Sequence, residues 1–273
     1  MTTSHWKGKN ALVCGATAGL GREIVEQLAK ADVANLGIVA RSAEPLQQLA
    51  EQLQSRFPRC KVHAISADMG RSESVADLQE QLTQFAGIDL VLNAIGQSDR
   101  GTIASLSMTK LSELYEANVV SSLHTIQAAR ASLEQRQGCM VLIGSLASFF
   151  APRFLGGYAL AKHSVAALAQ QARLELQEDG IHVMLACPGP IRRADAGTRY
   201  QEQQESDLPD SAMQPGGGAK ISGLDPQKLA RDILIAAARK QKTLVRPRKA
   251  RLLIGLNAIF PSLAESILKN RTS

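Results

Sequence analysis

The sequence predicts an α/β fold, a doubly wound open sheet of seven parallel strands with helices on both faces. Short apolar runs bounded by turn residues alternate with longer amphipathic segments, which is the pattern of repeated β-α-β units. The first apolar run leads into a glycine-rich loop, as in sheets that bind ligands at the carboxyl ends of their strands. With 273 residues, 45% of them hydrophobic, the chain suits one domain over residues 1–273.

The expected elements follow one another in strict alternation. Strands are expected at Ala11–Cys14, Leu36–Ala40, Val62–Ile65, Leu90–Asn93, Met140–Ile143, His182–Cys187 and Leu244–Val245. Helices are expected at Leu20–Ala31, Pro45–Arg56, Ser74–Phe85, Leu111–Arg136, Tyr158–Glu178 and Pro226–Arg239. Crossovers between parallel strands put these helices on both faces of the sheet.

A polar segment, Ile191–Leu224, breaks the alternation and contains Pro-Gly-Gly-Gly at Pro215–Gly218. A long excursion of this kind in a compact domain is usually functional or disordered. It follows the sixth strand, at the edge of the sheet where ligands bind. We expect a substrate lid over 191–224, with a solvated disordered segment as the alternative.

The positive charge of the chain is local. The net charge is +6, yet seven Lys and Arg residues lie in the acid-free stretch Arg239–Arg251. Aromatic residues make up only 4% of the chain, which argues against a surface that stacks on bases. We therefore expect no nucleic-acid partner.

The cysteines and histidines predict neither disulfides nor a metal site. Cys14, Cys60, Cys139 and Cys187 form no Cys-x-x-Cys pair and read as buried free thiols of a reducing compartment. No His-Glu-x-x-His motif occurs. The N-terminus lacks the apolar core of a signal peptide, and no run reaches the ~18 apolar residues of a membrane span. We expect a cytoplasmic protein.

The glycine-rich loop after the first strand predicts a dinucleotide site. Gly15, Gly19 and Gly21 lie between an expected strand and an expected helix. Glycines let the backbone approach a pyrophosphate, and the helix N-terminus supplies amide donors. The spacing Gly-x-x-x-Gly-x-Gly differs from the more common Gly-x-Gly-x-x-Gly, so the structural context carries the prediction.

Arg41 favours NADP(H) over NAD(H). The second strand ends at Ala40, where a protein that binds a free ribose 2′-hydroxyl usually places an acid. A guanidinium at this point matches a 2′-phosphate, and Arg22 is placed to assist it. A solvated arginine at a strand end is the alternative.

Tyr158, Lys162 and Ser145 have the spacing of an acid–base site. Tyr158 precedes Lys162 by four residues, so one helix face carries both. A neighbouring ammonium lowers a tyrosine pKa from its usual value of roughly 10 and lets the phenol exchange protons near neutral pH. Ser145, thirteen residues before Tyr158, would help to hold a carbonyl oxygen. Taken alone, the pair would be an ordinary surface Tyr and Lys.

Several such motifs in a fixed order make the chain resemble a short-chain dehydrogenase/reductase of the compact, single-domain, NADP(H)-type branch, a Rossmann fold. The resemblance extends from about Lys9 to Arg248. It rests on Cys14–Gly21, Asp68, Asn93-Ala94-Ile95-Gly96, Asn118, Ser145, Tyr158, Lys162 and Pro188-Gly189.

The resemblance implies a set of cofactor contacts. Asp68 would meet the adenine amino group, although it could instead cap a helix near Ser72. The remaining implied contacts are Gly15, Thr17, Gly19, Leu20, Gly21, Arg22, Arg41, Asn93, Gly96, Tyr158, Lys162, Pro188, Gly189 and Ile191.

The resemblance also implies the catalytic roles. Tyr158 would protonate the carbonyl oxygen, Lys162 would lower the Tyr158 pKa and bind the nicotinamide ribose, and Ser145 would polarise the carbonyl. Asn118 would hold a water of a proton relay, or distort its helix with a structural hydrogen bond. Three departures from the family pattern are Cys14, where Thr is usual, Asn93-Ala94-Ile95-Gly96, which loses one structural amide of the pattern Asn-Asn-Ala-Gly, and Arg192-Arg193, where Thr is expected. The arginines would either meet a polar group near the lid or face solvent.

The C-terminal tail, residues 249–273, is basic and amphipathic. Its expected helix around Leu252–Leu268 would pack on its own domain or on a second subunit, which we favour. A weak contact with an anionic membrane surface is the alternative. Exposed leucines in this number are an aggregation liability, so we expect a homodimer or homotetramer.

Together these features predict an enzyme that uses NADP(H) to reduce a ketone or aldehyde, and to oxidise a secondary alcohol in reverse. A bulky, apolar, lipid- or steroid-like small molecule is the favoured substrate. The alternatives are a regulatory protein that binds NADP(H) without turnover and a peripheral membrane protein. The full set of Ser145, Tyr158, Lys162 and Asn118 favours the enzyme, because a sensor needs no proton donor.

Overall fold

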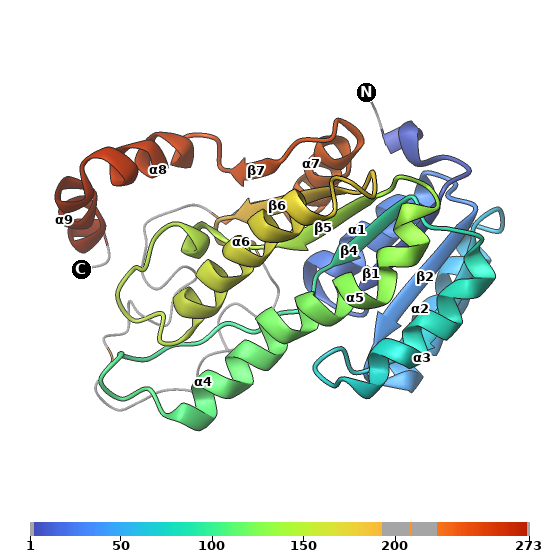
Figure 1. The fold of residues 1–273 in the computed structure, drawn as a ribbon, viewed down its shortest axis with the longest axis horizontal. Helices are drawn as coiled ribbons and strands as arrows, with labels where there is room; N and C mark the ends of the chain where they lie inside the picture. The colour runs from blue at the N-terminus through green and yellow to red at the C-terminus, as the bar shows by residue number, and fades with distance from the viewer. Residues whose placement is uncertain (1–2, 193–207, 209–222, 272–273) are drawn as a thin grey trace.

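The computed structural model describes residues 3–192, 208 and 223–271, and its centre is a seven-stranded parallel sheet (Figure 1). The strand order is β3-β2-β1-β4-β5-β6-β7. The strands are β1 (Asn10–Cys14), β2 (Asn35–Ala40), β3 (Lys61–Ser66), β4 (Leu90–Asn93), β5 (Cys139–Ile143), β6 (His182–Pro188) and β7 (Thr243–Arg246). Each begins and ends within one residue of the expected apolar run, so the predicted doubly wound sheet is confirmed.

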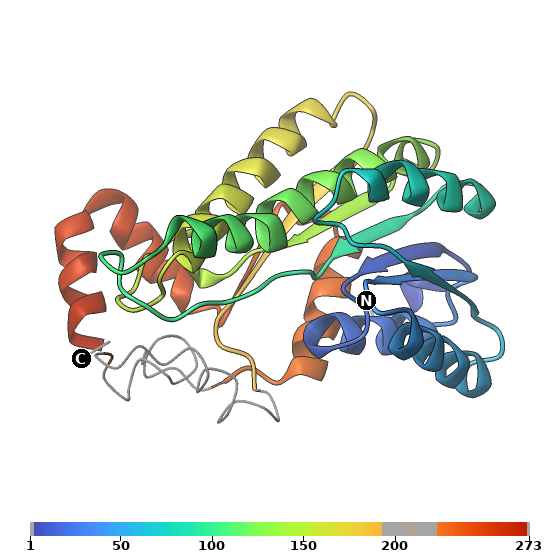
Figure 2. The ribbon, with the colours of Figure 1, turned by 90° about the horizontal axis from the view of Figure 1, so that it is seen from below.

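Helices cover both faces of the sheet (Figure 2). Helices α1, α2 and α7 lie on one face, and α3, α4, α5 and α6 on the other. Their bounds are α1 (Gly19–Lys30), α2 (Ala43–Arg56), α3 (Glu73–Leu82), α4 (Met108–Tyr115), α5 (Ser121–Glu134), α6 (Tyr158–Glu175) and α7 (Pro226–Ala238). Two further helices, α8 (Ala250–Ile259) and α9 (Pro261–Arg271), follow β7.

Each strand contributes to two cores because its side chains alternate between the two covered faces. In β1, Ala11 and Val13 face the core under α1, α2 and α7, whereas Leu12 and Cys14 face the core under α3, α5 and α6. Cys14 is fully buried behind the glycine-rich loop, where burial raises the pKa of its thiol to about 12. Cysteine in place of threonine is thus accommodated by packing. All four cysteines are buried and free.

The strand order reverses between β1 and β4, and this switch point organises the site. In an open parallel sheet, ligands bind outside the carboxyl ends of the strands at such a point. Apart from Asn118, which lies between α4 and α5, the motifs identified in the sequence follow the carboxyl end of a strand or lie at the start of the next helix. The topology therefore brings motifs from distant parts of the chain to one edge.

Two helical segments differ from expectation. The single helix expected over Leu111–Arg136 is divided by a π-helical turn, η3 (Glu116–Val120), between α4 and α5. The single tail helix expected around Leu252–Leu268 is two helices, because Pro261 cannot continue α8 and instead begins α9. Across the described residues, every helix is too short or too polar to cross a membrane.

Most of the expected lid, 193–207 and 209–222, lies outside the described residues. The residues that flank it are held together. Ile191 and Leu224 form a parallel β-bridge, in which the Arg192 amide donates to the Leu224 carbonyl at 2.9 Å and the Leu224 amide donates to the Pro190 carbonyl at 2.7 Å.

Candidate active site

A groove of about 1830 Å³ runs along the carboxyl edge of the sheet. The loops after β1, β2 and β3 line one end of it, and the loop that contains the short helix η4 (Leu146–Ser148) lines the other, together with helices α8 and α9. The predicted site residues that line it are Gly15, Thr17, Gly19, Leu20, Arg22, Arg41, Asp68, Gly96, Asn118, Ser145, Tyr158, Lys162, Pro188, Gly189 and Ile191. Two predicted residues, Gly21 and Asn93, lie behind it.

The loop between β1 and α1 has the geometry of an anion site. Gly15 has φ +83, and a side chain there would place its Cβ only 2.9 Å from the Ile95 amide nitrogen. A Cβ on Gly21 would overlap the Gly15 carbonyl oxygen, so Gly21 allows the helix to pack against the loop. No hydrogen bond from a described side chain caps α1 at Ala18. Its first amides are therefore available to a phosphate.

Three charged residues of the predicted site line the same end of the groove as the loop between β1 and α1. Arg41 directly follows β2, is exposed, and has its carbonyl held by the Ser66 hydroxyl at 3.2 Å. Arg22 donates to the Gln52 side chain at 3.2 Å. The Asp68 carboxylate accepts the Gly70 amide at 3.0 Å, so Asp68 caps its own turn rather than the helix near Ser72.

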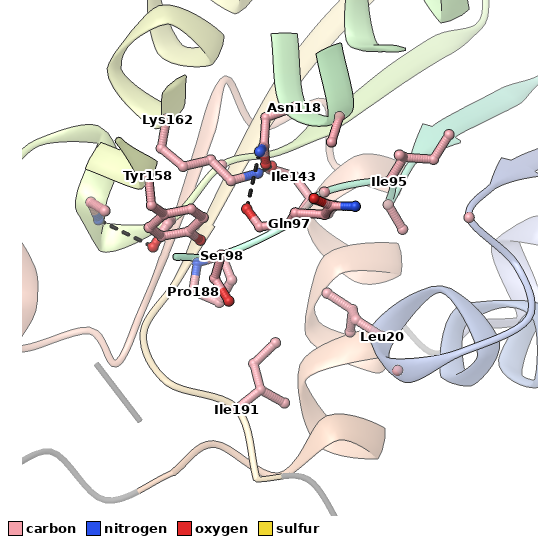
Figure 3. Close-up of a pocket in the computed structure, with 18 of the residues that line it drawn as sticks. Leu20, Ile95, Gln97, Ser98, Asn118, Ile143, Tyr158, Lys162, Pro188 and Ile191 are labelled. Atoms are coloured by element: carbon pink, nitrogen blue, oxygen red, sulfur yellow. Dashed lines mark hydrogen bonds between the residues drawn. The ribbon is translucent and has the colours of Figure 1, made fainter. Parts of the chain in front are cut away.

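Tyr158 and Lys162 lie on the first turn of α6 and point into the groove (Figure 3). Lys162 is 4% exposed, and its ammonium donates to the Ile143 carbonyl at 2.9 Å. The Lys162 nitrogen lies 5.8 Å from the centroid of the Tyr158 ring. Burial lowers the pKa of Lys162 to about 8. The phenol therefore has a buried cation one helical turn away.

Ser145 is fixed by the short helix η4 (Leu146–Ser148). Its hydroxyl accepts the Ala147 amide at 3.1 Å. The Ser148 hydroxyl accepts the Ser145 amide at 3.2 Å and donates to the Lys162 carbonyl at 2.9 Å. Buried Ser148 thus ties the Ser145 loop to α6. Sequence analysis missed this residue, although a hydroxyl three residues after Ser145 matches a capping box.

Asn118 lies in the π-helical turn, and both hydrogens of its side-chain amide are used (Figure 3). The amide nitrogen donates to the Gln97 carbonyl at 3.0 Å and to the Leu114 carbonyl at 2.8 Å. Its Oδ1 is buried and has no hydrogen-bond partner among the described residues. A Cβ on Gly96 would lie 2.7 Å from this oxygen and 3.2 Å from the Lys162 nitrogen. The distorted helix and the free acceptor therefore occur together.

Buried hydroxyls support the π-helical turn. Ser121 donates to the Ala117 carbonyl at 2.8 Å, and Ser122 donates to the Asn118 carbonyl at 2.7 Å. Asn93 donates to Ser122 at 3.0 Å and accepts the Ile95 amide at 2.9 Å. Asn93 thereby shapes the loop at Gly96 from behind. Two adjacent serines at the start of α5 are the sequence signal for this arrangement.

The end of β6 completes the groove wall. Gly189 donates its amide to the Arg246 carbonyl at 2.7 Å, which joins this loop to β7. Arg192 forms an ion pair with Asp225 at 2.5 Å, and Asp225 also caps α7 through the Lys228 amide at 2.9 Å. Through this ion pair, Arg192 contacts the residue that caps the start of α7. Arg193 lies outside the described residues.

The end of the groove beyond Tyr158 is mainly apolar. Its lining side chains are Leu146, Phe150, Pro152, Leu155, Leu252, Leu253, Leu256, Ile267 and Leu268. The nearly buried Arg100 adds one positive charge to this wall, and its guanidinium donates to the Asp99 carbonyl at 2.6 Å. In the described part of the chain, no group of three or more His, Cys, Asp or Glu residues is arranged to hold a metal ion.

Comparison with known proteins agrees with this geometry. The family model described as short chain dehydrogenase matches residues 9–205. Dehydrogenase/reductase SDR family member 7B from Bos taurus is 29% identical over 87% of this chain and 73% of its own length. A short-chain dehydrogenase from Sphingobium yanoikuyae, solved with NADPH, superposes with a TM-score of 0.74 at 23% identity, over 94% of this chain and 95% of its own. A short-chain dehydrogenase/reductase from Burkholderia phymatum, solved with NAD, superposes with a TM-score of 0.79 at 18% identity, over 95% of this chain and 96% of its own.

Proposed function

The chain belongs to the short-chain dehydrogenase/reductase family, and on that premise we propose that it reduces a ketone or aldehyde with NADP(H) and runs in reverse as an alcohol oxidation. The observation that carries this proposal is the buried Lys162 ammonium one turn from the Tyr158 phenol, inside a groove that Ser145 and Asn118 also line. A protein that only sensed a nucleotide would need the phosphate end of this groove but not a proton donor.

In the proposed reaction, Tyr158 gives its phenolic proton to the carbonyl oxygen of the substrate. The bound nicotinamide supplies the hydride. Lys162 stays charged at neutral pH, since its pKa is about 8, and it stabilises the phenolate that remains. The Ser145 hydroxyl already accepts the Ala147 amide, which leaves its hydrogen to donate to the same carbonyl oxygen.

A water held by Asn118 is proposed to return the proton. The Asn118 Oδ1, which has no hydrogen-bond partner within the described part of the chain, faces the space beside Gly96 and the Lys162 nitrogen. A buried acceptor in a polar pocket is a site for an ordered water. A water held by Asn118 next to Lys162 would connect the phenol to solvent after each turnover.

The residues of the groove fit a dinucleotide. We propose that the amides at the start of α1 bind the pyrophosphate and that Asp68 meets the adenine. The ribose next to the nicotinamide would lie against Gly96 and Lys162, and Pro188, Gly189 and Ile191 would frame the nicotinamide. The supports for these roles are the Gly15 loop, the uncapped helix and the placement of these residues along one groove.

NADP(H) is proposed over NAD(H) because of Arg41. The two solved structures of similar fold hold NADPH and NAD respectively, and at 23% and 18% identity they support the fold alone. The choice therefore rests on this chain, where Arg41 follows β2 at the groove and Ala40 stands in place of an acid. A guanidinium pairs with a 2′-phosphate through charge-assisted hydrogen bonds.

A bulky apolar substrate is proposed because of the wall beyond Tyr158. Ligand pockets commonly measure about 300–1,000 Å³, whereas this groove measures about 1830 Å³ with its cofactor end included. Contact with the leucines of α8 and α9 and with Phe150 would remove apolar substrate surface from water, which would stabilise the complex by about 25 cal/mol per Å² of apolar surface buried.

The test is a screen of carbonyl substrates with NADPH, followed by Tyr158→Phe on the best substrate. The variant keeps the ring and loses the proton, so kcat should fall by about 10²–10⁴-fold with NADPH affinity nearly intact. Tyr115→Phe is the matched control, because the Tyr115 hydroxyl bonds Ser164 at 2.9 Å outside the groove lining. Wild-type turnover by Tyr158→Phe would refute the mechanism, and tight NADPH binding without turnover of any carbonyl would favour a regulatory protein.

A further inference from the structure

Helices α8 and α9 form a hairpin, residues 250–271, with apolar side chains on two sides. On the inner side, Leu253, Leu256, Ile267 and Leu268 line the groove, and Ile254 packs against the domain core. Ile254 thus holds α8 on its own domain, while the other four side chains face the groove. The outer side consists of Leu252, Ile259, Phe260 and Leu263, which are exposed, and we call it the outer face.

The outer face is a concentrated patch of exposed apolar side chains. Leu252 is 80% exposed and Ile259 is 70% exposed, and they lie seven residues apart, on one side of α8. Four of the nine large hydrophobic residues exposed in the described part of the chain belong to this hairpin. Figure 1 shows α8 and α9 projecting from the end of the sheet beyond β7. A patch of this kind marks a surface that binds something.

Exposed basic side chains lie in the segments that lead into β7 and α8, and Arg251 is the chain neighbour of Leu252 in the outer face. These basic residues are Arg239, Lys240, Lys242, Arg248, Lys249 and Arg251, all exposed, and we call them the basic rim. Arg239, Arg248 and Arg251 gather around one small hollow, so residues apart in sequence share one surface. Lys249 is the N-cap residue of α8 and Arg251 lies in its first turn, so their charges lie next to Leu252 at this end of the outer face. Within 250–271 the only acid is Glu265.

We propose that the outer face and the basic rim dock the protein on an anionic lipid surface. Apolar side chains beside exposed Lys and Arg are the composition that binds the boundary between headgroups and acyl chains. A second copy of this chain fits less well, because a two-fold interface would bring one basic rim against the other. An anionic bilayer offers complementary charge and an apolar interior together.

The docked orientation would place the groove next to the lipid. Leu252 belongs to the outer face and also lines the groove, so the groove opens beside the docking surface. An apolar molecule dissolved in the bilayer would then reach the apolar wall without crossing water. Docking itself does not rest on the proposed reaction, and its test requires no turnover.

The first test places a polarity-sensitive fluorophore at Ile259→Cys in the full chain. The four natural cysteines are buried, so an engineered exposed cysteine is labelled selectively. Vesicles of phosphatidylcholine with phosphatidylserine should shift its emission to the blue. Phosphatidylcholine vesicles alone should cause little shift. Leu174→Cys, at another exposed leucine on α6, is the matched control and should not respond.

The second test measures sedimentation with the same vesicles. Arg248→Gln with Arg251→Gln should weaken binding by on the order of tenfold, as should Leu252→Ser with Ile259→Ser. Lys30→Gln and Leu174→Ser are the matched controls, and thermal unfolding checks that every variant folds. Added salt should release the wild-type protein, since it screens exposed charges.

Three outcomes would overturn the proposal. One is the absence of binding to anionic vesicles by the wild-type protein. Another is equal binding to neutral vesicles that the arginine variants do not change. The third is a change of sedimentation coefficient in Leu252→Ser with Ile259→Ser without any vesicle effect, which would assign the outer face to a second copy of the chain.

Discussion

Lys162 illustrates how a single residue can be suited to chemistry at the expense of stability. A lysine is rarely buried, because the charged form loses hydration. Here the ammonium donates a hydrogen bond to the Ile143 carbonyl, and burial lowers its pKa from 10.5 to about 8. One pKa unit corresponds to about 1.4 kcal/mol, so the charged form destabilises the folded state by about 3 kcal/mol.

Lys162→Met should therefore stabilise the protein at pH 7 while abolishing turnover. Loss of the hydrogen bond to the Ile143 carbonyl removes about 1 kcal/mol of this stabilisation, so the free energy of unfolding should rise by about 1–2 kcal/mol. Between pH 8 and 10.5 the unfolded wild-type chain binds the proton that the folded chain has released, so wild-type stability rises with pH in that window. The advantage of the variant should shrink there. Urea unfolding of both proteins across this range measures it, and a constant difference would contradict the assigned pKa.

At the scale of elements, the π-helical turn between α4 and α5 shapes the centre of the site. A π turn shifts the backbone hydrogen bonds and frees carbonyls, which the side chains of Asn118, Ser121 and Ser122 then bond. Asn118 is held on two sides and packs against Gly96. The loop after β4 and the π turn must therefore fit each other closely.

Gly96→Ala should disturb this fit. The added Cβ would lie 2.7 Å from Asn118 Oδ1 and 3.2 Å from the Lys162 nitrogen, so both side chains must move. We expect kcat to fall at least about tenfold and the free energy of unfolding to fall by about 1–3 kcal/mol. Gly255→Ala, where a Cβ meets nothing within 4 Å, is the control and should stabilise α8 by about 0.5–1 kcal/mol. Unchanged kinetics in Gly96→Ala would show that the contact is loose.

The comparison of sequence with structure is instructive at this scale. All strands could be predicted to within a residue, because each contains a short apolar run bounded by turn residues, and most are buried on both faces, although the edge strand β3 is mostly exposed or half-buried. The π turn could not be predicted, since it depends on how side chains compete for freed carbonyls in a packed site. Pro261 could have shown that the tail is two helices. Ser148 escaped notice because its role depends on the path of the η4 loop.

At the scale of the whole molecule, one groove joins two ends with different chemistry. Arg41 follows β2, and the α8–α9 hairpin follows β7, the strand at one edge of the sheet. Between them lie β1, β4, β5 and β6, whose carboxyl ends carry the glycine loop, Gly96, Ser145 and Gly189. The proposed cofactor end and the apolar wall are thus built from separate parts of the chain.

This separation predicts that the two ends respond independently to substitution. Arg41→Ala should weaken NADPH about ten- to hundredfold and leave NADH unchanged, because only NADPH carries the 2′-phosphate. Leu256→Ala, on the apolar wall, should raise KM for a bulky apolar ketone by roughly tenfold and leave a small ketone unaffected. Sites more than about 10 Å apart with no shared partner are usually additive within ~0.5 kcal/mol.

In the double variant Arg41→Ala with Leu256→Ala, we expect the loss of NADPH affinity and the rise in KM for the bulky ketone to equal those of the single variants. Titration measures NADPH affinity, and steady-state kinetics measures KM with both ketones. Equal loss of NADPH and NADH in Arg41→Ala would mean that Arg41 acts through the fold of the loop and not through the 2′-phosphate. A strong coupling between the two substitutions would mean that the hairpin and the cofactor end move together, and the groove would have to be treated as one site.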